Sequence, residues 1–208
     1  MIIASVGITA CGNPYMSPVD PMAINTSISQ DEATIVFFRP SKFWGGGSAL
    51  QIATIPLGMV FSGAGKAEPI VLEVEENVKP KYITVLCTNG KFLHKTTPGK
   101  HLYTAAGDNF LETNLEAGKA YYAYVLERFG GLRPQFILLP ATASELSSEE
   151  FRKAFAKCDW YENKPYGQKV FDANRDNIEK HLIEKYYTSK PEDKVLMLPE
   201  YGTDTPIR

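Results

Sequence analysis

The stretch that decides the fold class is Ala120-Tyr-Tyr-Ala-Tyr-Val-Leu126, seven residues without a charge, a glycine or a proline. Aromatic and β-branched side chains favour extended backbone, so this stretch predicts a strand. Gly130 and Gly131 end it, and residues 135–139 predict the next strand. Similar short runs come earlier, at residues 33–38, 48–55, 70–75, 101–104 and 110–115. Short strands separated by turn residues predict a mainly β domain, a β-sandwich of the immunoglobulin- or prealbumin-like kind.

Turn chemistry suggests how some of these strands are joined. Asn89-Gly90 is the preferred residue pair of a tight hairpin turn, and it separates two β-rich runs, 82–87 and 91–94. The sequence therefore predicts a hairpin here. Residues 97–100 predict a further turn, and residues 56–67 are interpreted as a loop.

The hydrophobic period changes near Ser147. Ser147 and Ser148 are candidate N-caps, and Glu150 completes a capping box with Ser147. The side chains that then fall on one helical face are Phe151, Ala154, Phe155 and Cys158. A second helix is expected over 172–187, with Ile178, Leu182 and Tyr186 facing inward, and residues 195–198 predict a last strand or a packed tail. We therefore expect a sandwich over 33–142 and a helical extension over 143–208 that packs on or beside it.

The N-terminus carries the sharpest local signal. Residues 2–10 form an apolar run that ends at Cys11 and is too short to span a bilayer. Ile8-Thr9-Ala10-Cys11 resembles the lipobox of bacterial lipoproteins, in which the cysteine is acylated. Residues 1–10 are then the remnant of a signal peptide, although a basic start is missing, and the proline-rich residues 11–32 form a lipidated tether. The alternative is a buried N-terminal strand in which Cys11 is incidental.

Composition and motifs restrict the function. The chain has 208 residues, 44% of them hydrophobic, and a net charge of −2 without a basic cluster, which disfavours disorder and nucleic-acid binding. The three histidines, His94, His101 and His181, are too scattered for a metal site, and the first two are expected to be solvated. Glu73, Glu75 and Glu76 lie close together and could do acid-base work, but they are interpreted as the solvated face and end of a strand. The sequence contains no Gly-x-Ser-x-Gly motif. We expect no cofactor, no metal and no enzymatic activity.

Other side chains are candidates for bonds or contacts. Cys87 and Cys158 could form a disulfide, or each could be a small buried residue. Phe43 and Trp44 precede three glycines and predict an aromatic tip that either contacts a partner, a ligand or a membrane, or folds back onto the domain. Trp44, or Tyr121 with Tyr122, could stack on a sugar ring.

Three segments carry a family resemblance: Ala33-Thr-Ile-Val-Phe-Phe-Arg-Pro-Ser41, Thr97-Pro-Gly-Lys-His101 and Leu115-Glu-Ala-Gly-Lys-Ala-Tyr-Tyr122. In this order they resemble a family of bacterial lipoproteins, the domain of unknown function 2846. The resemblance covers about residues 33–140 and leaves out the segment from Ser147 onward. It implies an exported β-sandwich and supplies no catalytic residues.

The expected function is that of an envelope lipoprotein with a structural or protein-binding role, such as an accessory subunit of an envelope-spanning secretion system. Its partners are then the membrane, through the lipid anchor, and other envelope proteins. Gly12, rather than an aspartate, follows Cys11. This resembles the pattern that sends lipoproteins to the outer membrane, facing the periplasm. The alternatives are a module that binds a small ligand or glycan and, third, an envelope hydrolase.

Overall fold

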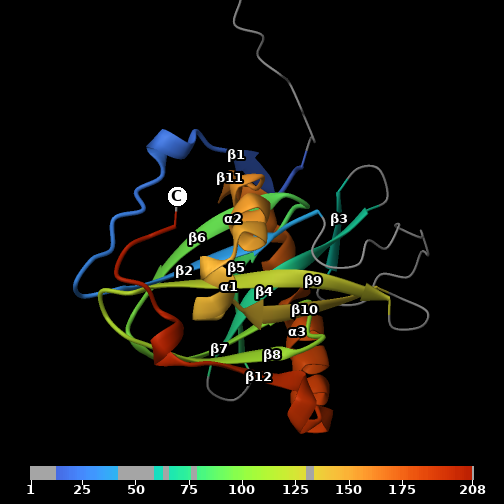
Figure 1. Ribbon diagram of the computed structural model, residues 1–208. Coiled ribbons are helices and arrows are strands. Elements are labelled where there is room, and N and C mark those ends of the chain that lie inside the picture. Colours follow the sequence, from blue (N-terminus) through green and yellow to red (C-terminus); the bar gives the residue numbers. More distant parts are fainter. Residues whose placement is uncertain (1–12, 42–58, 63–65, 76–78, 130–133, 208) are drawn as a thin grey trace, which may run out of the picture.

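Two mixed β-sheets stack face to face in a sandwich-like arrangement (Figure 1). The computed structural model describes residues 13–41, 59–62, 66–75, 79–129 and 134–207. The first sheet has the strand order β1 (Met16–Pro18), β11 (Asp159–Asn163), β6 (Gly90–Thr96), β2 (Ala33–Arg39), β9 (Ala120–Phe129) and β10 (Pro134–Pro140). The second has the order β12 (Lys194–Met197), β8 (Phe110–Leu115), β7 (Gly99–Ala105), β4 (Lys66–Glu75) and β3 (Met59–Ser62), and β5 (Lys79–Val85) also pairs with β4. The mainly β, two-sheet prediction is thus confirmed.

Helices cover the outer faces of both sheets, so the molecule has four layers. The helices are α1 (Ala143–Ser147), α2 (Glu149–Ala156) and α3 (Pro165–Thr188), with short 3-10 turns η1 (Pro21–Ala23), η3 (Pro191–Asp193) and η4 (Pro199–Tyr201). The main core lies between the sheets, where Ile35 and Phe37 of β2 point inward. The next side chains along the same strand, Val36 and Phe38, point outward, because successive residues of a strand face opposite sides.

The outward side chains of the first sheet pack against α1 and α2. The ring of Phe38 lies 5.3 Å from that of Phe151 and 5.2 Å from that of Phe155. The buried Lys91 of β6 donates to the backbone oxygen of Phe155 at 3.2 Å, with its ammonium 4.4 Å from the Phe155 ring. Because the last carbonyls of a helix carry negative partial charge, this contact stabilises the end of α2. The expected inward face of this helix is confirmed.

Helix α3 covers the second sheet in the same way. Its buried side chains Phe171, Ile178 and Leu182 join the outward residues Leu72 and Val74 of β4. The expected helical face is confirmed, although the helix begins at Pro165, seven positions before the predicted start at 172. Proline is well tolerated in the first helical turn, where its missing N–H has no intrahelical partner.

The predicted hairpin at Asn89-Gly90 is wrong. A turn is present, since Asn89 has φ = 60° and the Gly90 N–H donates to the oxygen of Cys87. The strands on either side, however, belong to different sheets: β5 pairs with β4, while β6 pairs with β2 and β11. Nor are residues 56–67 only a loop, because β3 and the start of β4 lie there.

The predicted domain boundaries also need correction. The C-terminal part is not an appended extension, because β11 pairs with β6 of the first sheet and β12 with β8 of the second. The N-terminal part is not a free tether from residue 13 onward, because β1 pairs with β11 and both Tyr15 and Met16 are buried. This arrangement is closer to the alternative of a buried N-terminal strand, and it leaves open the role of Cys11, which lies outside the described residues.

Candidate functional site

Tyr121 and Tyr122, predicted as exposed contact residues, are buried side chains. The Tyr121 hydroxyl accepts from the N–H of Glu116 at 2.9 Å, and the Tyr122 hydroxyl accepts from the N–H of Ile207 at 2.6 Å. Tyr121 faces the intersheet core and Tyr122 the layer under α2, as alternation along β9 requires. The Tyr121 hydroxyl also donates to the backbone oxygen of Pro199 at 3.3 Å, so both rings position the C-terminal segment. Because both side chains are buried, the sugar-stacking role for this pair is wrong.

The remaining predicted residues are not brought together. Cys87 and Cys158 are buried thiols in different apolar clusters, one under α3 and one under α2, and no disulfide joins them in this structure. Burial raises the pKa of Cys158 to about 12, which keeps that thiol protonated. Cys11, Phe43 and Trp44 lie outside the described residues.

A charged cluster on three strands of the second sheet was missed by the sequence reasoning. Glu73 of β4 is only 7% exposed, and its Oε1 lies 2.6 Å from Nδ1 of His101 in β7. Its Oε2 lies 3.3 Å from the ammonium of Lys81 in β5. The other ring nitrogen of His101 lies 2.8 Å from the backbone oxygen of Thr97. The expectations of a solvated Glu73 and a solvated His101 are therefore wrong.

The electrostatics of this cluster favour an ion pair. The hydrogen bond with Glu73 raises the pKa of His101, and the same bond, helped by Lys81, lowers the pKa of Glu73 although burial opposes it. Since the Thr97 carbonyl can only accept, Nε2 of His101 carries a proton and donates it in a hydrogen bond to that carbonyl. In the ion pair, Nδ1–H of His101 donates to the carboxylate of Glu73. Both ring nitrogens are thus occupied, which suits holding β4, β7 and the 97–100 turn together better than proton transfer.

His94 of β6 faces this cluster from the other sheet. Its ring centroid lies 6.0 Å from that of Tyr103 and 6.2 Å from that of Phe37. Its Nε2 is buried with no hydrogen-bond partner among the described residues. Burial lowers the pKa of His94 to about 4, with the charges of Lys81 and His101 acting in the same direction and Glu73 opposing them. The expectation of a solvated His94 is wrong, and His94 is neutral at pH 7.

Acid is expected to destabilise the fold through His94. Its folded pKa lies below the unfolded value of 6.5, so the unfolded chain binds the proton more tightly, and stability falls as the pH drops from about 6.5 to about 4. The loss attributable to this residue is up to about 3 kcal/mol. Urea unfolding at several pH values should therefore show a smaller acid loss for His94→Leu than for the wild type.

His101→Gln serves as the control, because the raised pKa of His101 gives stability that is present below pH 6.5 and is lost only as the pH rises through its folded value. This variant should retain the acid loss. An unchanged acid dependence in His94→Leu would mean that His94 is already protonated in the folded protein.

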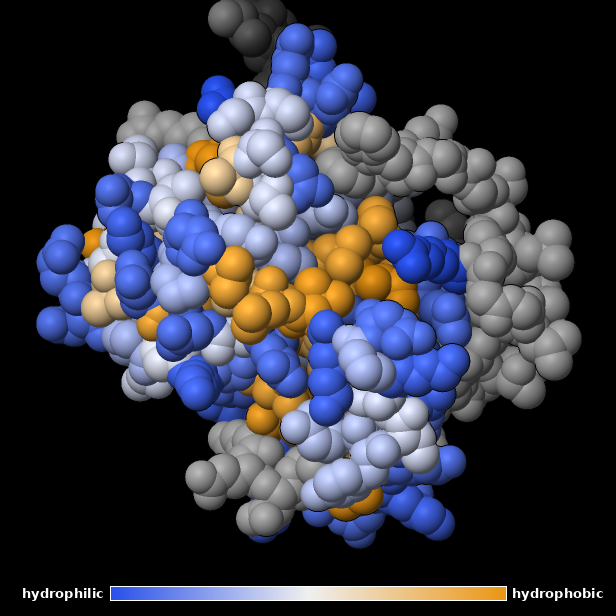
Figure 2. All heavy atoms as spheres, turned by 60° about the horizontal axis from the view of Figure 1, so that its bottom comes forward, coloured by the Kyte–Doolittle hydropathy of each residue, from blue (hydrophilic) through white to orange (hydrophobic). Residues whose placement is uncertain are grey.

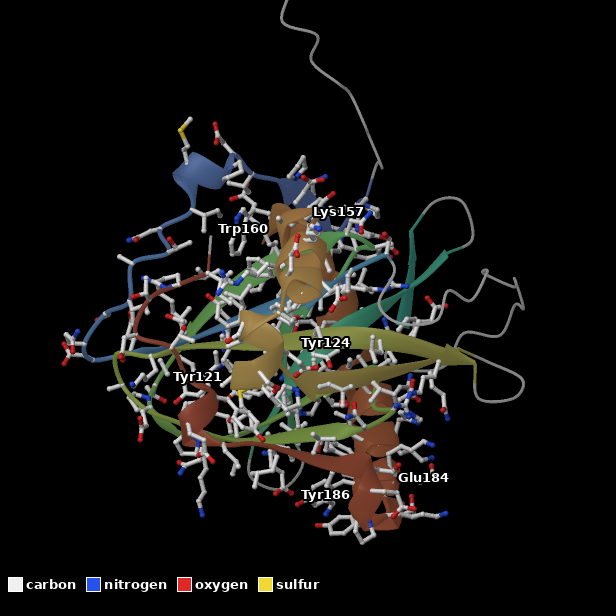
Figure 3. The ribbon with its side chains drawn as sticks, viewed as in Figure 1. Tyr121, Tyr124, Lys157, Trp160, Glu184 and Tyr186 are labelled. Carbon is white, nitrogen blue, oxygen red and sulfur yellow. The ribbon has the colours of Figure 1, made fainter. Side chains whose placement is uncertain are left out.

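Exposed apolar side chains gather at the C-terminal end of α3 and on β12. Tyr187 is 74% exposed, Leu196 is 51% exposed and Ile183 is 37% exposed. Tyr186 connects the two elements, with its ring 5.5 Å from that of Tyr187 and 4.4 Å from the ammonium of Lys194 (Figure 3 labels Tyr186). Figure 2 shows further apolar side chains in a band across the face that carries this end of the molecule. We call Ile183, Tyr187 and Leu196 the apolar end surface.

A polar cavity of about 130 Å³ lies beside this surface, between the β7–β8 connection and the end of α3. It is lined by Gly107, Asp108, Phe110, Gln135, Lys185, Thr188, Ser189 and Asp193. The hydroxyls of Thr188 and Ser189 already donate to helix carbonyls, and a carboxylate oxygen of Asp193 accepts from the N–H of Lys190. Much of the hydrogen-bonding capacity of the residues that line the cavity is therefore used within the C-terminal end of α3 and the turn that follows it. Within the described residues no three His, Cys, Asp or Glu side chains are placed to hold a metal ion.

Comparisons of the chain with protein-family models, with curated proteins and with solved structures found no match. None of the helices in the described part of the chain is both long enough and apolar enough to cross a bilayer.

Proposed function

We propose that the chain is a bacterial envelope lipoprotein with a protein-binding rather than a catalytic role. The observation that supports this best is the apolar end surface, which leaves Tyr187 and Leu196 largely open to water. Large exposed apolar side chains that gather on one surface often mark a contact with another protein. All three residues of this surface belong to the C-terminal region, as expected for a partner contact outside the segment that resembles the lipoprotein family.

The chemistry of the charged cluster is consistent with this role. His101 is held at both nitrogens, and Glu73 contacts both His101 and Lys81. These groups stabilise the domain that presents the apolar end surface. The membrane anchor at Cys11, the outer-membrane location and the family relationship are parts of the same proposal, and they are supported by the lipobox and the three family-like segments. An immunoglobulin- or prealbumin-like relationship is likewise proposed only for the sandwich.

A charge placed in the apolar end surface should disrupt partner binding. Leu196→Asp and Tyr187→Asp are each expected to weaken the complex by about 30-fold, because an apolar anchor at the centre of an interface contributes about 2 kcal/mol. The measurement is co-purification from gently solubilised native membranes, followed by titration of the partner so identified with purified domain.

Asn177→Asp is the matched control, since it adds the same charge to an exposed position of α3 outside the apolar end surface. It should bind as the wild type does. If all three variants retain the same partners with equal affinity, the apolar end surface is not the binding site. Absence of acyl groups on Cys11 in protein from native membranes, shown by intact mass, would remove the lipoprotein part of the proposal.

A further inference from the structure

The fold begins almost immediately after Cys11. The Asn13 side chain is buried and donates to the thiol of Cys87 at 2.6 Å, and its backbone oxygen accepts from the ammonium of Lys164 at 2.9 Å. Two residues further along the chain, the backbone oxygen of Tyr15 accepts from the N–H of Lys164 at 2.8 Å. The chain is therefore fixed to the domain from Asn13 onward, by contacts with segments far away in the sequence.

This leaves very little chain between an acyl group and the domain. Only Gly12 separates Cys11 from Asn13, and two peptide steps reach about 7 Å at most. That is far less than the 30 Å of a bilayer core or the width of the domain itself. A domain anchored at Cys11 therefore cannot move away from the lipid, whatever conformation the residues before Asn13 adopt.

The surface at this end has the composition of a membrane–water boundary. Met22 of η1 is 91% exposed, and Tyr166 in the first turn of α3 is 48% exposed. Amphipathic aromatic rings are favoured at headgroup level. Residues 13–23 and 157–169 together contain three lysines (157, 164 and 169) and three acids (Asp20, Asp159 and Glu162), so their charges cancel.

We propose that the end of the domain formed by β1, η1, β11 and the first turn of α3 lies directly on the lipid surface. Met22 and Tyr166 contact the headgroup region there. This inference rests on the acylation of Cys11 in the proposed function. Because the charges of this end cancel, the contact does not depend on anionic lipid.

The same geometry determines where the apolar end surface points. Helix α3 begins beside the Asn13 contacts, and its 24 residues span about 36 Å before it ends near Tyr187. Figure 1 shows β1 and η1 at one end of the molecule and the C-terminal end of α3 at the other. The apolar end surface therefore lies about 36 Å along α3 from the end that contacts the lipid.

The test uses two single-cysteine reporters in the otherwise complete chain, Met22→Cys and Leu196→Cys. Each is prepared in the acylated form on phosphatidylcholine vesicles and in a lipid-free form carrying Cys11→Ser. Intact mass establishes acylation, and the measured quantity is the rate of labelling by a bulky, membrane-impermeant maleimide. The native thiols Cys87 and Cys158 are buried and give the background.

We expect acylation to slow the labelling of Met22→Cys about tenfold, as for a side chain held in the headgroup layer, and to leave Leu196→Cys unchanged. A long Gly-Ser insertion after Gly12 should restore the rate at Met22→Cys. Equal rates at Met22→Cys in a protein whose mass shows acylation would overturn the membrane contact and leave the lipoprotein proposal intact. A protein without acyl groups would overturn both. Slowing that requires anionic lipid would contradict the neutral contact proposed here.

Discussion

Glu73→Ala is expected to destabilise the domain by about 3–5 kcal/mol, the usual cost of removing one partner from a buried ion pair. The variant leaves the imidazole of His101 and the ammonium of Lys81 without their shared carboxylate. It also leaves His94 facing two cationic groups without the anion that offsets them. Urea denaturation at pH 7 measures the loss directly.

Glu112→Ala is the matched control, because Glu112 is an exposed glutamate of β8 in the same sheet. Its effect should stay within about 0.5 kcal/mol. A double-mutant cycle with Glu73→Gln and His101→Gln isolates the pair, and residues in direct contact should show a coupling of about 0.5–3 kcal/mol. A loss below about 1 kcal/mol in Glu73→Ala would mean that the cluster does not hold β4, β5 and β7 together.

Phe38→Ala is expected to cost a similar 3–5 kcal/mol, through a different mechanism. The Phe38 ring is completely buried, and it packs edge-on against Phe151 and Phe155 of α2. Removing it opens a cavity between the first sheet and the two short helices. Urea unfolding measures the cost, and the near-ultraviolet signal of the aromatic cluster should weaken in the folded state.

Two further variants separate the cavity from a general effect of losing an aromatic ring. Phe38→Leu retains apolar volume and should cost less than Phe38→Ala. Tyr187→Ala removes a ring that is 74% exposed and should change stability by about 0.5 kcal/mol or less. If Phe38→Ala were no more harmful than Tyr187→Ala, α1 and α2 would not be held by the packing described above.

Local sequence patterns predicted most strands, because the residue types that favour a strand are neighbours in the sequence. The run at 110–115 coincides with β8, and the runs at 33–38, 101–104 and 120–126 lie inside β2, β7 and β9. The helical face with Phe151 and Phe155 was likewise predicted from the helical spacing of its apolar residues. Strand pairing was not readable, because it depends on residues far apart: Asn89-Gly90 fixes a turn but does not determine that the next strand joins β2 in the other sheet.

The charged cluster could not be predicted for the same reason. Glu73, Lys81 and His101 come from three strands, and only the registers Glu73↔Lys81 and Glu73↔Tyr103 bring them together. Acidic and basic residues in short strands normally indicate a solvated face, and that rule failed here because pairing supplied a counter-charge to each. Tyr121 and Tyr122 were misjudged since an aromatic pair has the same appearance in a core as on a binding surface. One weak signal was available, the Thr97–His101 turn, which places an imidazole beside a backbone carbonyl.

The long-range closure of the first sheet has a consequence for how the chain folds. Lys164 and Asn13, which meet beside β1, are 151 positions apart, and β12 closes the second sheet only at residues 194–197. Pairings of such large sequence separation are slow to form, because the intervening chain must first be brought together at an entropic cost. A ribosome must therefore release the chain through residue 163 before the first sheet is complete, and through residue 197 before the second sheet is complete. Until then each sheet lacks one of its strands, so the two apolar faces of the sandwich are not yet fully covered.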